Sequence, residues 1–336
     1  WRRQKRTVWL FPPKSVTPTL IRYWSDYINV VENRFLVNLL RPLALLPGLR
    51  LDTFRSVNVA DQIKEEIVPG VYIIQREYER QLGGAPLLTL KKEDEVRGRQ
   101  ILKGLGVPQG AWFVCLHVRE MGYRGVAQQA YRDSDIGTYL PAIEEIVDRG
   151  GWVIRMGDPF MKPLPDLDGV IDYANSHIRT DWMDVFCFSQ CRFTLATTSG
   201  PFNLAFVFGV PCALTNFVPM GHGAYSHRDL WIPKLYWSEK EQRYLTFRES
   251  LNSQYRRFTS ANTLTDWGIS VVDNTPKEIA DLTVEMINRL DYEDHYSDHD
   301  EELQACFKSL LESDPRWATS ARVGTQFLRD RSDLLV

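Results

Sequence analysis

Residues 112–120 read Trp-Phe-Val-Cys-Leu-His-Val-Arg-Glu, an apolar run that ends in polar side chains. A short run with β-branched and aromatic members predicts a buried strand. Open α/β sheets bind their ligands beyond the carboxyl ends of their strands, so His117, Arg119 and Glu120 are the first candidate site residues. The structural alternative, in which Arg119 forms an ion pair with a nearby carboxylate, stays open at this point.

The chain beyond residue 110 alternates between predicted strands and helices. Strands are predicted at 112–118, 152–156, 169–173, 192–197, 211–217 and 269–272, and helices at about 135–149, 180–190, 201–208 and 276–290. Thr275 and Pro276 fit the N-cap and the first position of the last helix. Such alternation is typical of a doubly wound parallel sheet, so the predicted fold class is α/β.

The first 110 residues have a less regular pattern. It predicts strands at 7–11 and 69–74 and helices across 19–47 and 87–105, and Pro and Gly at 106–110 predict a domain boundary there.

Two N-terminal stretches leave a membrane contact open. The basic residues 2–6 beside a strand and the apolar run 36–49 allow a peripheral contact with an anionic membrane, although a solvated terminus and core packing are favoured.

The composition limits the class of protein. At 336 residues the chain exceeds one ordinary core, so two domains are expected. A net charge of −3 gives no general attraction to nucleic acid, which we exclude as a partner. Five cysteines, mostly in apolar runs, favour reduced buried thiols. Without a signal peptide or a run of about 18 apolar residues, a cytoplasmic protein is expected.

A second motif lies at residues 194–203, Thr-Leu-Ala-Thr-Thr-Ser-Gly-Pro-Phe-Asn. It reads as a strand, a turn rich in hydroxyl groups, and a helix that opens with proline. Free backbone N–H groups at a helix start attract anions, and Thr197, Thr198, Ser199 and Gly200 therefore predict a phosphate site. A plain N-cap is the alternative. No Walker motif, dinucleotide glycine motif or Gly-x-Ser-x-Gly elbow occurs, which disfavours ATP hydrolysis, NAD chemistry and serine hydrolysis.

Taken in order, these motifs resemble the donor half of GT-B glycosyltransferases of the fucosyltransferase-like branch. The resemblance rests on His117-Val118-Arg119, Gly157-Asp158 and the 197–200 loop. The wider run 112–237 is similar to a group of bacterial glycosyltransferases found with surface-polysaccharide genes. It covers residues 110–240 well, the C-terminal part loosely and the first 100 residues poorly. Glu120-Met-Gly-Tyr departs from the Arg-Thr-Asp that often follows His-Val-Arg, which weakens the case for a fucose donor.

The resemblance implies roles for individual residues. Arg119 would face the donor β-phosphate, and His117 would support the phosphate or position Arg119. The 197–200 loop would hold the pyrophosphate. Asp158 would accept hydrogen bonds from a base or ribose, or else cap its own turn.

An inverting reaction needs a general base, for which Glu120 is the first candidate and His222 the second. Asp133 and Asp135 are the third. Asp133-Ser134-Asp135 and Asp166-Leu167-Asp168 have the spacing of a metal motif but not its strand context, so a metal-independent enzyme is expected.

The resulting prediction is a two-domain GT-B protein with two Rossmann-like domains facing a cleft. Residues 1–108 would bind the acceptor, residues 109–275 the donor, and residues 276–336 would form helices that cross back. The enzyme would move a sugar from a nucleotide-sugar co-substrate, with GDP slightly favoured and no other cofactor, to a glycan or lipid-linked glycan in bacterial surface-polysaccharide synthesis, at the inner face of the membrane. Alternatives are a sugar-nucleotide epimerase or hydrolase, and a non-catalytic binding module.

Overall fold

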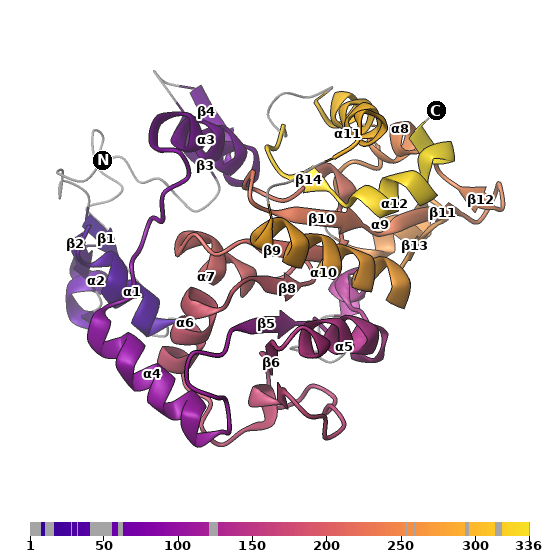
Figure 1. Ribbon diagram of the computed structural model, residues 1–336. Coiled ribbons are helices and arrows are strands. Elements are labelled where there is room, and N and C mark those ends of the chain that lie inside the picture. Colours follow the sequence, from indigo (N-terminus) through magenta and orange to yellow (C-terminus); the bar gives the residue numbers. More distant parts are fainter. Residues whose placement is uncertain are drawn as a thin grey trace.

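The architecture is mixed α/β, built on one large parallel sheet (Figure 1). The computed structural model describes residues 8–10, 17–27, 29–31, 33–40, 56–59, 63–120, 127–252, 254–258, 260–292, 296–312 and 318–335. The sheet has seven strands in the order β14-β10-β9-β8-β5-β6-β7, and all of its pairings are parallel. Its strands are β5 (Phe113–His117), β6 (Trp152–Arg155), β7 (Val170–Ile171), β8 (Thr194–Ala196), β9 (Cys212–Phe217), β10 (Leu230–Pro233) and β14 (Arg322–Val323).

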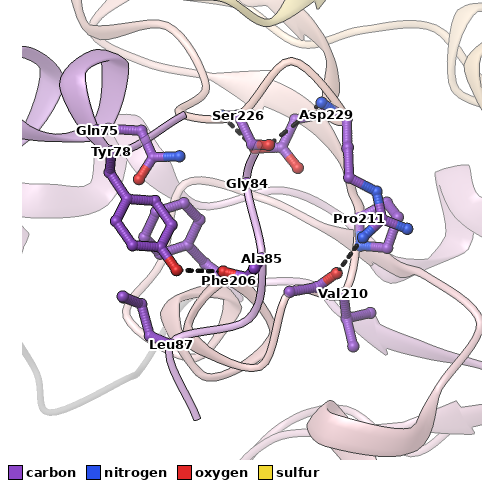
Figure 2. Close-up of a pocket in the computed structure, with 12 residues that line it drawn as sticks. Gln75, Tyr78, Gly84, Ala85, Leu87, Phe206, Val210, Pro211, Ser226 and Asp229 are labelled. Atoms are coloured by element: carbon purple, nitrogen blue, oxygen red, sulfur yellow. Dashed lines mark hydrogen bonds between the residues drawn. The ribbon is translucent and has the colours of Figure 1, made fainter. Parts of the chain in front are cut away.

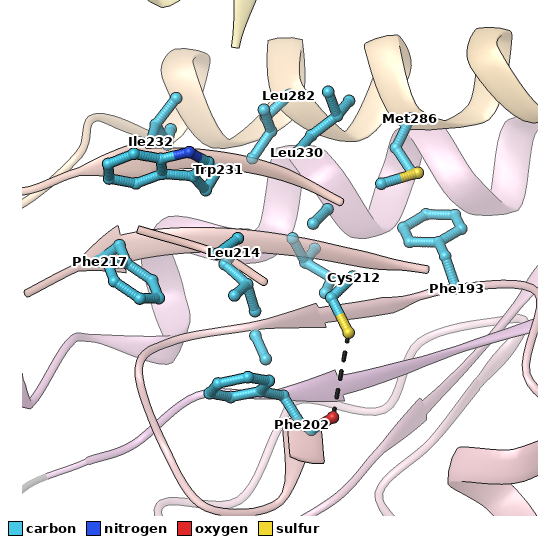
Figure 3. Close-up of a cluster of buried hydrophobic side chains, with 14 of the residues drawn as sticks. Phe193, Phe202, Cys212, Leu214, Phe217, Leu230, Trp231, Ile232, Leu282 and Met286 are labelled. Carbon is cyan, nitrogen blue, oxygen red and sulfur yellow. Dashed lines mark hydrogen bonds between the residues drawn. The ribbon is translucent and has the colours of Figure 1, made fainter. Parts of the chain in front are cut away.

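Helices cover both faces of this sheet, which is why its central strands consist mainly of apolar residues. Figure 3 shows Leu282 and Met286 of α10 (Pro276–Asp291) above Leu230, while Phe202 of α7 (Phe202–Val207) lies below Cys212. Helix α5 (Leu140–Asp148) packs beside α10, and α6 (Asp181–Gln190) packs against α7. The alternation predicted between residues 112 and 217 is confirmed, whereas the strand predicted at 269–272 lies in a separate antiparallel sheet and strands β10 and β14 were not predicted.

The start of α10 follows the predicted chemistry. The Thr275 hydroxyl accepts a hydrogen bond from the Glu278 backbone N–H, the Glu278 carboxylate accepts one from the Thr275 N–H, and Pro276 occupies the first turn. This reciprocal cap satisfies two of the donors that every helix start leaves free.

A smaller antiparallel sheet and several helices lie beyond residue 235. Its strands run in the order β12 (Arg243–Tyr244), β11 (Leu235–Ser238) and β13 (Ile269–Val272). Helices α8 (Phe247–Ser250) and α9 (Ala261–Asp266) lie between β12 and β13, and α11 (Asp298–Leu311) and α12 (Thr325–Asp330) follow α10. Edge strand β14 lies between α11 and α12, so the C-terminal segment contributes to the large sheet.

The predicted helix across residues 19–47 is wrong in its extent. The structure has α1 (Pro18–Trp24), strand β2 (Asn29–Val31) and α2 (Arg34–Leu40), and β2 pairs in parallel with the predicted strand β1 (Val8–Leu10). Two valines favour the extended backbone of β2. The Asn33 side chain then starts a new helix by accepting hydrogen bonds from the Phe35 and Leu36 N–H groups. Residues 41–47 lie outside the described part of the chain.

The strand predicted at residues 69–74 is also wrong, because this stretch lies in helix α3 (Ile67–Leu82). Proline is tolerated in a first helical turn, where the missing N–H would have no partner. The helical spacing of Tyr72 and Glu79 then places both side chains against residues 223–227, where Tyr72 Oη donates to the Gly223 carbonyl at 2.8 Å.

The described part of residues 1–108 contains no second doubly wound sheet. Its strands form the β1-β2 pair and the antiparallel pair β3 (Ser56–Val59) and β4 (Ile63–Glu66). Helices α1 and α4 (Lys92–Gly104) pack on α6, where Trp182 Nε1 donates to Asp94 at 2.8 Å. A side chain at Gly98 would collide with Phe186, so α4 approaches α6 closely there. The two-domain division therefore stays a prediction.

The C-terminal segment contacts helix α3 as well as the large sheet, to which it contributes strand β14. Arg76 of α3 donates to the Ala318 carbonyl at 2.6 Å, and the Ser320 hydroxyl donates to Glu79 at 2.5 Å.

Among the described helices, none is long and apolar enough to cross a bilayer. Four cysteines are buried as predicted, and Cys306 is exposed; all five are free thiols.

Candidate functional site

The two sequence motifs meet at the point where the strand order of the large sheet reverses. From β5 the chain proceeds to β6 and β7 on one side, and then returns to form β8 on the other side of β5. Such a switch point leaves a crevice beyond the carboxyl ends of the flanking strands, where open α/β sheets bind ligands. The Thr197 N–H donates to the His117 carbonyl at 3.1 Å, and the Arg119 N–H donates to the Thr197 hydroxyl at 3.0 Å.

Arg119 has a buried carboxylate partner. Its Nε lies 2.8 Å from Oδ1 of Asp133, and its carbonyl accepts a hydrogen bond from the Ser134 N–H. The ion pair considered as the structural alternative is therefore present. Asp133 belongs to the Asp-x-Asp sequence, and its neighbour Asp135 caps the next turn by accepting the Gly137 N–H. No group of three or more metal-ligating side chains occurs in the described part of the chain.

Glu120 is held by a guanidinium from the adjacent strand. Arg155 at the end of β6 is fully buried and donates to Glu120 Oε2 at 2.5 Å, to Asp172 at 3.0 Å and to the Lys162 carbonyl at 2.9 Å. Burial raises the pKa of Glu120, and the Arg155 charge opposes that rise. Glu120 is thus an ion-pair partner, and its role as a base stays a prediction.

His117 is buried beneath this pair. Its Nδ1 has no hydrogen-bond partner among the described residues. Burial, with the Arg155 charge as the second cause, lowers the pKa of His117 to about 4. The imidazole is therefore neutral near pH 7, so its ring can support Arg119 but adds no charge of its own.

The Thr198–Gly200 loop is secured by a residue that sequence reasoning missed. Arg132, on the 3-10 helix Ala127–Arg132, donates from Nε and Nη2 to the Thr198 carbonyl at 3.1 and 2.7 Å. The Thr198 hydroxyl accepts the Val218 N–H at 2.9 Å. Helix α7, which follows the loop, has only six residues. Its dipole is small, so positive charge at this edge comes mainly from arginines rather than from the predicted helix start.

His222 lies near Arg132 and near two further arginines, Arg256 and Arg257. It ends the 3-10 helix Met220–His222 and is partly buried. Burial, followed by the charges of Arg257, Arg132 and Arg256, lowers the pKa of His222 to about 4. Burial and the Arg119 charge likewise lower the pKa of Arg132. His222 and Arg119 therefore both lie within electrostatic range of Arg132, and the positive charge of the arginines here favours an anionic ligand.

The carboxyl end of strand β9 is held by a reciprocal asparagine pair. The Asn216 N–H donates to Asn274 Oδ1 at 2.5 Å, and the Asn274 N–H donates to Asn216 Oδ1 at 2.6 Å. Asn216 is buried with a φ of 50°, a left-handed conformation that is uncommon outside glycine. Such outliers gather at functional sites, where the surrounding structure maintains them. The sequence placed Asn216 inside the strand predicted at 211–217, and nothing there predicted its left-handed conformation.

Lys234 is a second residue that sequence reasoning missed. It is buried, donates to the Asp133 carbonyl at 2.7 Å and forms an ion pair with Asp273 at 2.7 Å. Burial lowers the pKa of Lys234, and Asp273 opposes this effect. Lys234 thus holds the backbone at Asp133, whose carboxylate is the partner of Arg119. The sequence feature that could have identified Lys234 is a single charged residue inside the apolar run 230–237.

Asp158 lies at the carboxyl end of β6 and caps its own turn. Its Oδ1 accepts the Phe160 N–H at 3.0 Å, and its carbonyl accepts the Met161 N–H at 3.0 Å. The turn-capping alternative is therefore what the structure shows, and a contact to a base or ribose stays a prediction.

A small pocket lies elsewhere, between α3 and the loop before β9 (Figure 2). Its cavity of about 20 Å³ has room for one water molecule but not for a nucleotide. Pro211, which lines it, precedes β9 and so marks the amino end of the sheet, opposite the site described above. The buried Asp229 beside it accepts the Cys212 and Ser226 N–H groups at 2.9 Å, which is a structural role.

Comparisons with known proteins add little to this geometry. No protein-family model matches the chain, and no curated protein matches its sequence. Among solved structures, a glycosyl transferase of family 9 from Veillonella parvula DSM 2008 is similar to part of it, with 10% identity and a TM-score of 0.29. The match covers 38% of this chain and 36% of that structure, so it spans little more than a third of either protein.

Proposed function

We propose that this protein is a glycosyltransferase that takes a sugar from a nucleotide-sugar donor. The observation that carries the proposal is the meeting of Arg119, Arg132 and the Thr197–Gly200 loop at the switch point of the parallel sheet. A nucleotide diphosphate leaving group gains negative charge as the glycosidic bond breaks. Guanidinium groups held in place before the reaction stabilise that charge at no cost of reorganisation.

The donor phosphates would lie over the Thr198–Gly200 loop, within reach of Arg132 and Arg119. Arg132 is half-buried, so its charge is less screened than that of a surface side chain. Ion pairing with Asp133 orients Arg119, and Lys234 in turn holds the Asp133 backbone. This network holds the Arg119 guanidinium in place, and the proposed reaction uses no metal ion.

In the proposed step, the acceptor hydroxyl oxygen bonds to the anomeric carbon as the bond from that carbon to the phosphate oxygen breaks. The electron pair leaves with the diphosphate, and the hydroxyl proton passes to a protein base. His222 and Glu120 remain the two candidates. His222 is neutral at pH 7, but burial and the arginines that lower its pKa to about 4 make it a weak base while the phosphate site is empty. Glu120 would have to accept the proton while paired with Arg155, so both stay candidates.

The wider context belongs to the same proposal. Residues 109–275 would hold the donor and residues 1–108 would bind a glycan or lipid-linked glycan acceptor. The reaction would be inverting and would serve bacterial surface-polysaccharide synthesis at the inner face of the membrane.

A thermal-shift screen tests the donor site. GDP-, UDP-, dTDP- and CMP-sugars are added to the wild-type protein and to Arg132→Ala. A ligand at 100 times its Kd adds about 2.7 kcal/mol to stability, enough to raise the melting temperature measurably. One nucleotide class should stabilise the wild type and have less effect on the variant. If none of the nucleotide sugars shifts the wild type, the donor-site proposal fails; binding without nucleotide release on acceptor addition indicates a binding module instead.

A further inference from the structure

Phe160 has the most exposed of the large apolar side chains in the described residues, with 90% of its surface accessible. It follows β6 at the carboxyl edge of the sheet, where the candidate donor site lies. Single exposed apolar residues are common and need no explanation by themselves. Its position and the rigidity of its turn distinguish Phe160 from such residues.

The turn that presents Phe160 is held on both sides. Asp158 accepts the Phe160 and Met161 N–H groups, with its side chain and its carbonyl respectively. Met161 is buried beneath the turn, and Arg179 donates to the Gly157 carbonyl at 3.2 Å. The ring is therefore exposed on an ordered backbone, and little additional backbone order is needed for a ligand to stack on it.

The same turn is linked through Arg155 to Glu120, the neighbour of Arg119 in the chain. One guanidinium nitrogen of Arg155 bonds both Glu120 Oε2, at 2.5 Å, and the Lys162 carbonyl, at 2.9 Å. Phe160 is two residues from Lys162, and Arg119 is next to Glu120 in the chain. Strands β6 and β8 flank β5, so the carboxyl ends of these two strands lie about two strand spacings apart, roughly 10 Å. Phe160 follows β6 and the Thr197–Gly200 loop follows β8, so both lie along the same edge of the sheet, where a nucleotide can place its base at one and its phosphates at the other.

We infer that Phe160 is the stacking platform for the nucleobase of the donor. This inference rests on the proposed function and adds to it a subsite for the base, separate from the arginines that would hold the diphosphate. Aromatic faces stack on any nucleobase, so Phe160 contributes affinity for nucleotides as a class, and the choice of base falls to other groups.

Isothermal titration with two probes separates the subsites. Inorganic pyrophosphate reports on the phosphate region, and GDP or UDP, whichever binds the wild type more tightly, reports on both regions. Phe160→Ala should weaken nucleoside diphosphate binding about 10- to 100-fold, the range found for base stacking, and leave pyrophosphate binding unchanged. Phe160→Trp should retain nucleotide affinity. Arg132→Ala should weaken both probes.

A matched control is Tyr292→Ala, which removes a ring that is 73% exposed. Tyr292 follows Asp291, whose carboxylate pairs with Arg192 before β8, so it lies near the opposite, amino edge of the sheet. It should change neither affinity. If Phe160→Ala binds the nucleotide as tightly as the wild type while Arg132→Ala does not, the platform is refuted and the donor site stands. If the variant alters only the KM for a saccharide acceptor, the base assignment is wrong. If the wild type binds neither probe, both proposals fail.

Discussion

Arg155 and Glu120 form a buried ion pair, 2.5 Å between Nη2 and Oε2, that joins the carboxyl ends of the adjacent strands β6 and β5. Arg155 also pairs with Asp172. Two carboxylates therefore depend on one cation that has no access to solvent.

Removal of the Arg155 charge should destabilise the fold strongly. Arg155→Met leaves Glu120 and Asp172 without their cation, and a broken buried pair typically costs about 3–5 kcal/mol. Urea denaturation at pH 7 measures this loss. Lys277→Met, which removes an exposed pair with Asp281, should leave the denaturation midpoint unchanged. A loss below about 1 kcal/mol for Arg155→Met would show that Glu120 does not need its partner.

Arg119 should be essential for turnover. We expect Arg119→Ala to lower kcat by about 100-fold or more, as the loss of one pre-positioned charge donor does elsewhere. Nucleotide release at saturating donor measures the rate, and circular dichroism checks the fold. Arg119→Lys keeps the charge but not the planar contact to Asp133, so partial activity is expected. Near-normal activity of Arg119→Ala contradicts its assigned role.

The pKa of His222 should rise when a diphosphate binds. Burial and the charges of Arg257, Arg132 and Arg256 hold this pKa near 4. An anion among the arginines offsets their charge, and nearby opposite charges raise a histidine pKa by about one unit or more. NMR titration of histidine side chains, with His222→Gln for assignment, measures the change on pyrophosphate addition. An unchanged pKa with pyrophosphate bound places the anion away from His222.

Asp229 should make stability depend on pH in a predictable direction. Burial raises its pKa to about 6, above the unfolded value of about 3.9, so the folded state takes up a proton between these values. Its contribution to stability is therefore complete below about pH 4 and is lost as the pH rises through about 6. The Asp229→Asn variant cannot ionise, although it loses one of two accepted hydrogen bonds.

Denaturation of both proteins at pH 4 and pH 7 measures this effect. The stability of Asp229→Asn relative to the wild type should improve by up to about 3 kcal/mol at the higher pH. An equal difference at both pH values shows that Asp229 ionises normally in the fold.

The large sheet could be predicted from sequence because its information is local. The five strands of this sheet between residues 112 and 217 are short runs rich in apolar residues between turn residues, and Thr275-Pro276 marks a helix start by its own chemistry. Strands β10 and β14 were not predicted, and β14 is the dipeptide Arg322-Val323. The first 108 residues were predicted only in part: the strand at 7–11 and the helix at 87–105 are present as β1 and α4, but the other predicted elements differ. Residues 69–74 contain proline, glycine and β-branched side chains typical of a strand, yet they are helical, and Tyr72 and Glu79 of that helix contact the 223–227 segment. Tertiary contacts override weak local preference.

By itself, then, the sequence determined a parallel α/β sheet with polar residues after the strands at 113–117 and 194–196. Only the tertiary structure decided that these two strands are neighbours at the switch point and that Arg132 holds the Thr198 loop. It also decided that Arg155 is the partner of Glu120. The physical reason is that a strand's apolar pattern specifies burial, whereas strand order and ion pairs depend on chain segments far apart in sequence.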